Sequence, residues 1–239
     1  MKRYLLTYAV TIVMMLIALP AFGAEADEQD YSSDMMNYYL NPKPKKLAEW
    51  LQAVAIEPTP EGQDDTIPAF FFGEALRRNP EQCANIKKVI LETDAEAIQR
   101  LGILSLWVAN VEASREALTA ICKQTNDTAL VDAVNSLLQQ EPREAIRTPI
   151  VNAADLDRLW MVFAATGDIQ TVQRIMSIGR YNPDKVLGKV SMDNFLLIKV
   201  ARWSLFSVAK NNALVDEALQ REETLRLPGD FGNPDGLPH

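Results

Sequence analysis

The chain has 239 residues, of which 48% are hydrophobic, and its 32 acidic and 24 basic side chains give a net charge of −8. This length suits one large domain or two small ones, and the hydrophobic fraction is ordinary for a globular core. The negative charge argues against binding to nucleic acid or to anionic lipid, since no cluster of Lys and Arg interleaved with aromatic residues offsets it.

The first 23 residues have the order of a secretory signal peptide. A short positive start, Lys2-Arg3, precedes a mostly apolar run over residues 4–19, and the chain turns acidic after a group of small residues. This order predicts a periplasmic or secreted protein that is cleaved after Gly23 or Ala24 and has no membrane association afterwards. An uncleaved membrane anchor is the alternative, because the run approaches the roughly 18 residues of a spanning helix.

Two further segments lack a regular period. Residues 24–42 are acidic, and we expect a flexible leader that docks in part through Tyr38, Tyr39 and Leu40. Residues 227–239 are rich in Pro and Gly, which cannot sustain a helix, and are expected to form a disordered tail.

Apolar residues recur at helical spacing along nearly all of residues 43–226, and no window alternates with period two for long enough to predict a strand. The expected helices cover residues 44–54, 67–78, 80–91, 94–109, 112–123, 127–139, 155–166, 169–178, 192–210 and 213–225. The predicted fold class is therefore all-α, with antiparallel helical hairpins packed as an α-solenoid-like stack or an irregular helical bundle. Prolines mark a candidate subdomain boundary near residues 140–152. The segments 98–109 and 192–210 are apolar nearly all round, which predicts a central position for both.

Two stretches share one pattern of aromatic residue, turn and valine. Residues 163–176 can be laid over residues 206–219, and each reads as a helix, a tight turn and a returning helix. Four residues occupy the two turns: Gly167, Asp168, Asn211 and Asn212. The first of each pair suits the left-handed conformation that ends a helix, and the second suits the N-cap of the next helix. A looser copy passes through Asn110. Descent from a repeated unit explains the pattern. So does the requirement of any helical hairpin for a turn and for apolar contacts between its two helices.

Three segments carry a resemblance to a known group of proteins. Residues 156–168, with Val172 and Ile175 after them, resemble a group of uncharacterised bacterial exported proteins, and residues 39–42 and 78–80 are similar to the same pattern. The resemblance implies a helical fold and carries no activity. The turn segment also resembles the second helix of an ankyrin repeat, although the motif that opens an ankyrin hairpin is absent.

Few of the side chains that carry enzyme chemistry are present. The single histidine is His239, the last residue of the Pro- and Gly-rich segment, so we expect no Ser-His-Asp or Cys-His pair and no histidine-based metal site. Asp155 and Asp157 lie at a helix start, where acidic side chains stabilise the positive end of the helix dipole. A hydrolase that uses such carboxylates alone is the least favoured alternative. We therefore predict no catalytic residue, no metal, no cofactor and no enzyme activity.

The cysteines and two of the tryptophans leave alternatives open. Cys83 and Cys122 both fall on apolar helical faces, and an oxidising compartment would allow a disulfide between them. Two buried free thiols are the other interpretation. Trp160 and Trp203 also fall on apolar faces, where they either fill the core or line a binding groove.

These observations favour a non-enzymatic protein-interaction module that binds a protein or peptide through a groove between hairpins. The alternative is an envelope immunity or inhibitor protein, whose acidic surface would suit a basic toxin.

Overall fold

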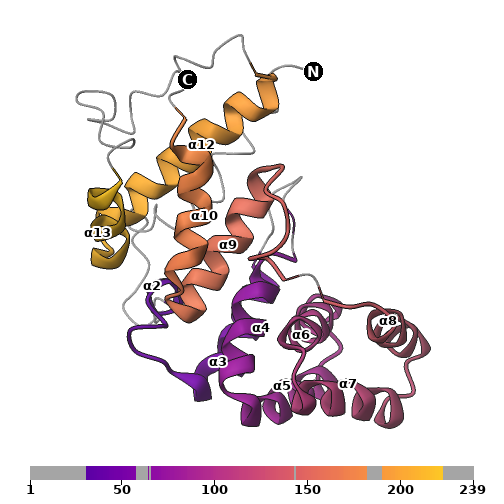
Figure 1. Cartoon of the computed structure of the whole chain (residues 1–239). Coiled ribbons are helices and arrows are strands. Elements are labelled where there is room, and N and C mark those ends of the chain that lie inside the picture. The colour runs from indigo at the N-terminus through magenta and orange to yellow at the C-terminus, as the bar shows by residue number, and fades with distance from the viewer. Residues whose placement is uncertain (1–30, 58–63, 65, 143, 182–189, 223–239) are drawn as a thin grey trace. The chain divides into compact units, whose positions relative to one another are not determined.

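The computed structural model describes residues 31–57, 64, 66–142, 144–181 and 190–222. Over these residues the chain forms eleven α-helices and no strand, which confirms the all-α class (Figure 1). The predicted signal peptide and the predicted tail lie outside the described residues. Within them, no helix combines the length and the apolar character needed to cross a membrane.

The chain divides into two compact units. The N-terminal unit contains the described residues 31–148 together with residues 164–167, and the C-terminal unit contains residues 149–163 and 168–222. The division after Thr148 falls inside the proline-marked range 140–152. Helix α9 (Ala153–Thr166) contributes to both units, because its last turn groups with the N-terminal one.

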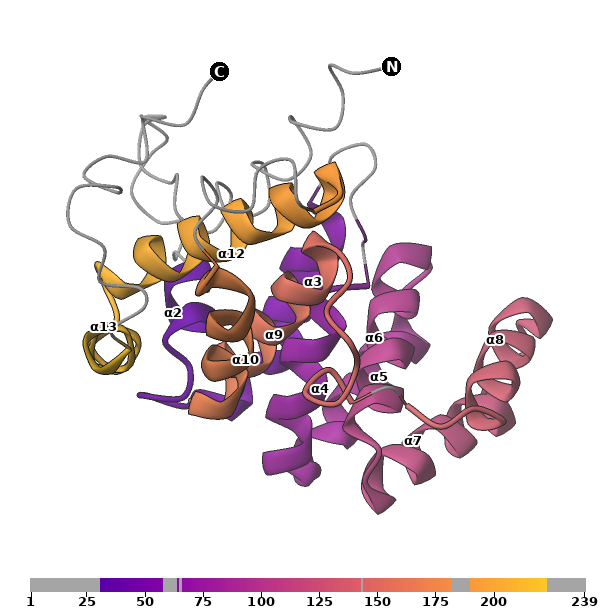
Figure 2. The same cartoon turned by 45° about the horizontal axis from the view of Figure 1, so that its top comes forward.

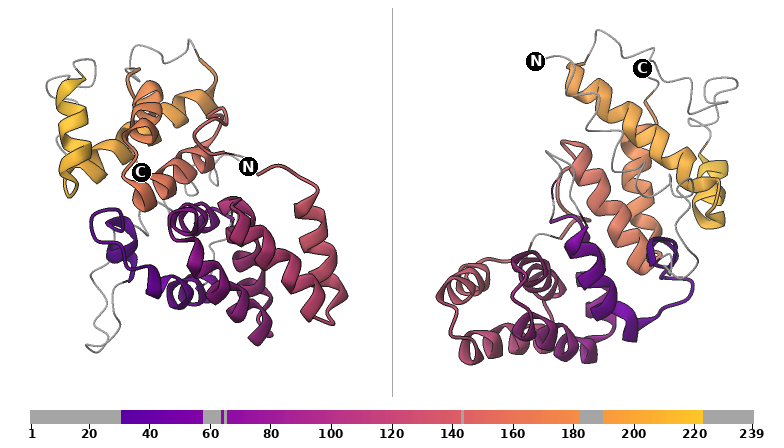
Figure 3. Two further views of the ribbon diagram at one scale, coloured as in Figure 1. Left: turned by 60° about the horizontal axis from the view of Figure 1, so that its bottom comes forward. Right: turned by 180° about the vertical axis from the view of Figure 1, so that it is seen from behind.

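Stacked helical hairpins build most of the N-terminal unit. Its helices are α2 (Tyr31–Met36), α3 (Leu47–Ile56), α4 (Pro68–Arg78), α5 (Cys83–Glu92), α6 (Glu96–Ala109), α7 (Glu112–Gln124) and α8 (Thr128–Leu138). Each helix from α3 to α6 packs against the next but one. Figures 1 and 3 accordingly show α6 and α8 in one row and α5 and α7 in another. This contact pattern is typical of hairpins that bury their faces against their neighbours.

Helix α6 is the central helix of this unit. It packs against α3, α4, α5, α7 and α8, as its all-round apolar sequence leads us to expect. Its closest neighbour is α4, where Gly73 lets the two helices approach. A Cβ at this position would lie 2.5 Å from Cγ1 of Val108. Only a glycine therefore fits this crossing without displacing α6.

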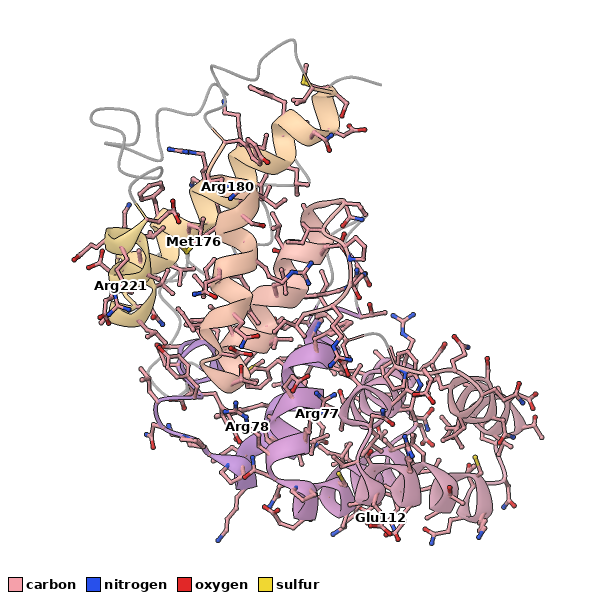
Figure 4. All side chains as sticks on the ribbon, viewed as in Figure 1. Arg77, Arg78, Glu112, Met176, Arg180 and Arg221 are labelled. Atoms are coloured by element: carbon pink, nitrogen blue, oxygen red, sulfur yellow. The ribbon has the colours of Figure 1, made fainter. Side chains whose placement is uncertain are left out.

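Arg77 of α4 caps the C-terminal end of α6. Its Nε donates to the carbonyl oxygen of Ala109 at 3.0 Å and its Nη2 to that of Val108 at 2.9 Å, while Nη1 lies 2.9 Å from the carboxylate of Glu74. Figure 4 shows Arg77 on the α4 ribbon. The carbonyls of a last helical turn have no partner inside their own helix, so this guanidinium supplies two of the missing donors.

Replacing Arg77 with lysine is expected to lower the free energy of unfolding by about 1–2 kcal/mol, because a single ammonium cannot span both carbonyls. Urea unfolding followed by circular dichroism measures the loss. The matched control is Arg221→Lys, since Arg221 forms an exposed pair with Glu217 one turn away, and its loss should stay below about 0.5 kcal/mol. Equal losses in the two variants would show that Arg77 does not act as a cap.

In the segment expected as a flexible leader, over residues 24–42, a helix begins at Tyr31, and the docking predicted for Tyr38 is present. Residues 31–36 form α2, and Tyr38 is only 1% exposed. The Tyr38 ring makes edge contacts with Trp50 and Phe71 at centroid distances of 6.2 and 5.5 Å, and its hydroxyl accepts a hydrogen bond from Asn79 Nδ2 at 3.3 Å. Burial raises the pKa of Tyr38 to about 12. Aromatic burial outweighs the acidic composition of the segment, although Leu40 stays 67% exposed and does not dock.

Residues of the N-terminal unit donate hydrogen bonds to the carbonyl groups in the last turn of α9. The backbone N–H of Tyr39 donates to the carbonyl of Ala164 at 3.2 Å, and Nη1 of Arg78 donates to that of Thr166 at 2.8 Å. Gly167 follows in the left-handed conformation, with φ of +67°. The Tyr39 ring lies against it so closely that a Cβ on Gly167 would be 2.4 Å from the ring atom Cδ2.

The C-terminal unit is a smaller group of helices. It contains residues 153–163 of α9, α10 (Ile169–Gly179), α12 (Met192–Ala209) and α13 (Ala213–Arg221). Helix α12 packs against α10 and α13, and Figure 2 shows α13 turning away at its end. One face of α12 is buried, whereas Trp203 and Phe206 are only half-buried. The central position expected for residues 192–210 is therefore not found for α12 within this unit.

The two predicted turns differ from each other. Asp168 accepts a hydrogen bond from the Gln170 N–H at 2.9 Å, and Asn212 accepts one from that of Val215 at 3.2 Å, so both act as N-caps. The left-handed conformation expected at Asn211 is wrong. Helix α12 ends through a tighter turn, in which the Asn211 N–H bonds to the Val208 carbonyl at 3.1 Å, and such a turn needs no positive φ.

Candidate functional site

Asp155 has a structural role at the start of α9. Its Oδ2 accepts the backbone N–H groups of Val151 at 2.9 Å and Asn152 at 3.1 Å, while Asn152 Oδ1 accepts the N–H of Asp155 at 3.1 Å. This reciprocal pair is a capping box. Nη1 of Arg158 lies 2.7 Å from the other carboxylate oxygen. Both oxygens of Asp155 are thus engaged in holding the helix start.

Asp157 occupies a different environment two residues further on. It is 4% exposed, and burial raises its pKa to about 7, with the charge of Arg158 acting in the opposite direction. The proton therefore stays on this carboxyl well above the usual range of an aspartate. The expected dipole-stabilising role does not describe Asp157, which is a buried titratable group.

The cysteines are unbridged. Cys83 is buried at the start of α5, and Cys122 is half-buried on α7 with its thiol 3.9 Å from Asn135 Oδ1. Burial raises the pKa of Cys83 to about 11 and also raises that of Cys122. Both thiols are therefore protonated at neutral pH and are poor nucleophiles. Across the residues that the structure describes, no group of three or more His, Cys, Asp or Glu is arranged to hold a metal ion.

Of the two roles left open for Trp160, the structure shows core filling. Its side chain is 2% exposed and makes an edge contact with Phe163 at a centroid distance of 5.9 Å, so it fills the core. Trp203 is half-buried on α12 and lines neither of the surface hollows described below. Another tryptophan, Trp107 at the end of α6, lines the better-enclosed of the two.

We call this hollow the Trp107 pocket. It has a volume of about 240 Å³ and opens in the N-terminal unit between α6, α7 and the chain that follows α8. Its apolar lining consists of Leu106, Trp107, Leu118, Leu138 and Pro142. Its polar lining consists of Asn110, Arg115, Gln140 and Glu141. The pocket therefore combines an apolar wall with one cation and one anion.

A hydrogen bond fixes the tryptophan and the wall opposite it. The indole Nε1 of Trp107 donates to the backbone carbonyl of Gln140 at 3.2 Å, which holds the chain after α8 against α6. Leu138, at the end of α8, is 40% exposed. A large apolar side chain on this wall is therefore open to solvent beside the half-buried indole.

The left-handed residue Asn110 orients the arginine. Asn110 ends α6 with φ of 49°, and its Oδ1 accepts hydrogen bonds from Nε and Nη2 of Arg115 at 3.0 and 2.6 Å. A neutral amide thus holds the guanidinium, and no carboxylate among the described residues lies within ion-pair distance of it. The charge of Arg115 remains available to a ligand at the rim of the pocket.

The exposed face of α7 continues from the pocket as a shallow surface. It carries Glu112, which Figure 4 labels, together with Arg115, Glu116 and Lys123. Positive and negative side chains alternate along this face. It is therefore a mixed-charge surface beside an apolar hollow.

Comparison of the chain with protein-family models, with curated proteins and with solved structures gives no match. The interpretation of the Trp107 pocket therefore rests on its own geometry. Trp107 belongs to the segment 98–109, which is apolar nearly all round, and this pattern does not distinguish it from a core tryptophan. The available signal was its position three residues before Asn110, at a helix end where side chains from the following helices converge.

Proposed function

We propose that this chain is a non-enzymatic protein-interaction module that binds a peptide segment of a partner protein at the Trp107 pocket. The observation that carries the proposal is the presence of Trp107 and Arg115 in one pocket, each oriented by a hydrogen bond. Trp and Arg are the residues most enriched at binding hot spots, and prior orientation lowers the entropy lost on binding.

The size of the pocket supports a peptide rather than a cofactor. Its volume of about 240 Å³ is below the roughly 300 Å³ at which sites for drug-sized molecules begin. One large apolar side chain fits such a space, and the exposed face of α7 offers room for the adjoining residues. We further propose that the module acts after export, in the periplasm or outside the cell, on the strength of the order of residues 1–23.

Peptides selected from a displayed random library by the full chain are expected to bind at this pocket. Trp107→Ala and Leu138→Glu should each weaken peptide binding at least about tenfold. The first substitution removes the indole from the pocket lining, and the second places a charge in the apolar part of that lining. Fluorescence anisotropy with labelled peptides measures the affinities.

The matched control is Ala133→Glu, which adds the same charge on an exposed position of α8 and should leave binding unchanged. Circular dichroism spectra of the variants check that they fold. Selected peptides whose affinities do not respond to either pocket substitution would argue against the proposed function.

A further inference from the structure

The rim of the Trp107 pocket is electrostatically uneven. Arg115 lies on α7 and is held by an amide oxygen, while Glu141 lies on the chain after α8. A ligand therefore meets a cation at one wall and an anion at another. Like charges placed together cost free energy and opposite charges steer a ligand, so such a rim selects the orientation as well as the composition of its partner.

We infer that the partner segment presents a large apolar side chain directly beside an Asp or Glu side chain, with the apolar group in the pocket and the carboxylate on Arg115. The inference rests on the proposed function and names the chemistry of the partner. The carboxylate of this proposal is that of a side chain, and the test below compares it with the carboxylate of a chain end.

The geometry of Arg115 supports a carboxylate. Asn110 Oδ1 occupies Nε and Nη2 on one edge of the guanidinium, and the Nη1 hydrogens on the other side remain for a second acceptor. A bond from a cationic donor to a carboxylate is roughly twice as strong as one between neutral groups. Because the Asn110 amide orients the side chain without neutralising it, Arg115 loses little conformational freedom when the carboxylate binds.

The opposite wall supports the same arrangement. Glu141 would repel a carboxylate on its side of the pocket, and Glu112 and Glu116 would repel one along the exposed face of α7, which leaves Arg115 as the cation of the pocket lining that can receive it. The apolar wall, which includes Trp107, Leu118 and Leu138, then receives the neighbouring side chain. A basic residue in place of the acidic one would meet Arg115 and bind more weakly.

The test uses five short peptides in a Gly-Ser background. Four have blocked ends and carry Leu-Glu, Leu-Gln, Leu-Lys or Ser-Glu at the centre, and the fifth ends in a free C-terminal Leu. Each is titrated into the full chain labelled with ¹⁵N at its tryptophan indoles, and the shift of the Trp107 resonance reports binding. We expect the Leu-Glu peptide to bind at least about five times more tightly than each of the other four.

Two substitutions complete the design. Arg115→Gln should reduce the affinity for the Leu-Glu peptide to that for Leu-Gln. Lys88→Gln, which removes an exposed cation of α5 outside both hollows, should leave the preference intact. Equal binding of Leu-Glu and Leu-Gln, tighter binding of Leu-Lys, or binding of the free C-terminal Leu alone would overturn the inference while leaving the pocket as a peptide site. A Trp107 resonance unmoved by every peptide would also overturn the inference, and the library selection decides separately on the proposed function.

Discussion

Replacing Gly167 with alanine is expected to lower the free energy of unfolding by about 2–4 kcal/mol. Two costs add in this variant. Gly167 has φ of +67°, a conformation that costs a residue with a Cβ about 1–2 kcal/mol. The new Cβ would also lie 2.4 Å from Cδ2 and 2.9 Å from Cγ of Tyr39. Since Cγ is the ring atom bonded to Cβ, the whole side chain must move. The hydrogen bond from the Tyr39 N–H to the Ala164 carbonyl is then strained as well.

A double-mutant cycle with Tyr39→Ala separates the two costs. In the Tyr39→Ala background, Gly167→Ala should cost only about 1–2 kcal/mol, because the conformational cost remains and the ring contact is gone. Urea unfolding of the four proteins gives the coupling energy. If the two substitutions prove additive, Tyr39 does not pack on Gly167 as the structure shows.

Asp157→Asn is expected to stabilise the protein by about 2–4 kcal/mol at pH 8 and hardly at all at pH 4. Burial raises the pKa of Asp157 from 3.8 to about 7 in the folded protein. Between these values the folded protein keeps the proton that the unfolded chain has lost, so the stability from this group falls as the pH rises. Below pH 3.8 both states are protonated, and above about 7 the full cost of a buried charge is present.

Urea unfolding at pH 4, 5, 6, 7 and 8 measures this dependence. The wild-type and Asp157→Asn curves should separate progressively between pH 4 and 7 and run parallel above. Asp132→Asn is the control, since Asp132 is exposed on α8 and its removal should produce no such divergence. A constant difference across the pH range would mean that Asp157 ionises as an ordinary surface aspartate.

Helical periodicity predicted most of the fold. The expected helix over residues 94–109 corresponds to α6, and that over 112–123 to α7, with differences of one or two residues at the ends. The short helix α2 was not predicted, because six residues are too few to show a period. The burial of Tyr38 against Trp50 and Phe71 depends on contacts between distant parts of the chain, which periodicity does not contain.

The helix ends show a second limit of the sequence. Asn110, Gly167 and Asn211 all follow a helix and all suit a left-handed residue, yet only the first two adopt it in the described chain. Either a left-handed residue or a tighter last turn can supply hydrogen-bond donors to the last carbonyl groups of a helix. The choice depends on the neighbouring elements, such as the Tyr39 ring that requires a glycine at 167.

The candidate site could be predicted only in part. The sequence drew attention to tryptophans on apolar faces, but the two that it singled out as groove candidates were Trp160 and Trp203, not Trp107. All three lie in apolar helical segments, and periodicity cannot tell which side of a helix its neighbours leave open. Arg115 and Glu141 are ordinary surface charges until the fold brings them to one pocket.

The central claim is that a partner peptide occupies the Trp107 pocket. The most direct measurement is an NMR titration of the full chain, labelled with ¹⁵N at the indole groups of its four tryptophans, with a peptide selected from the library. We expect the Trp107 indole resonance to shift in proportion to occupancy while those of Trp50, Trp160 and Trp203 stay in place. A bound peptide that leaves Trp107 unmoved, or that shifts Trp203 instead, would contradict the claim.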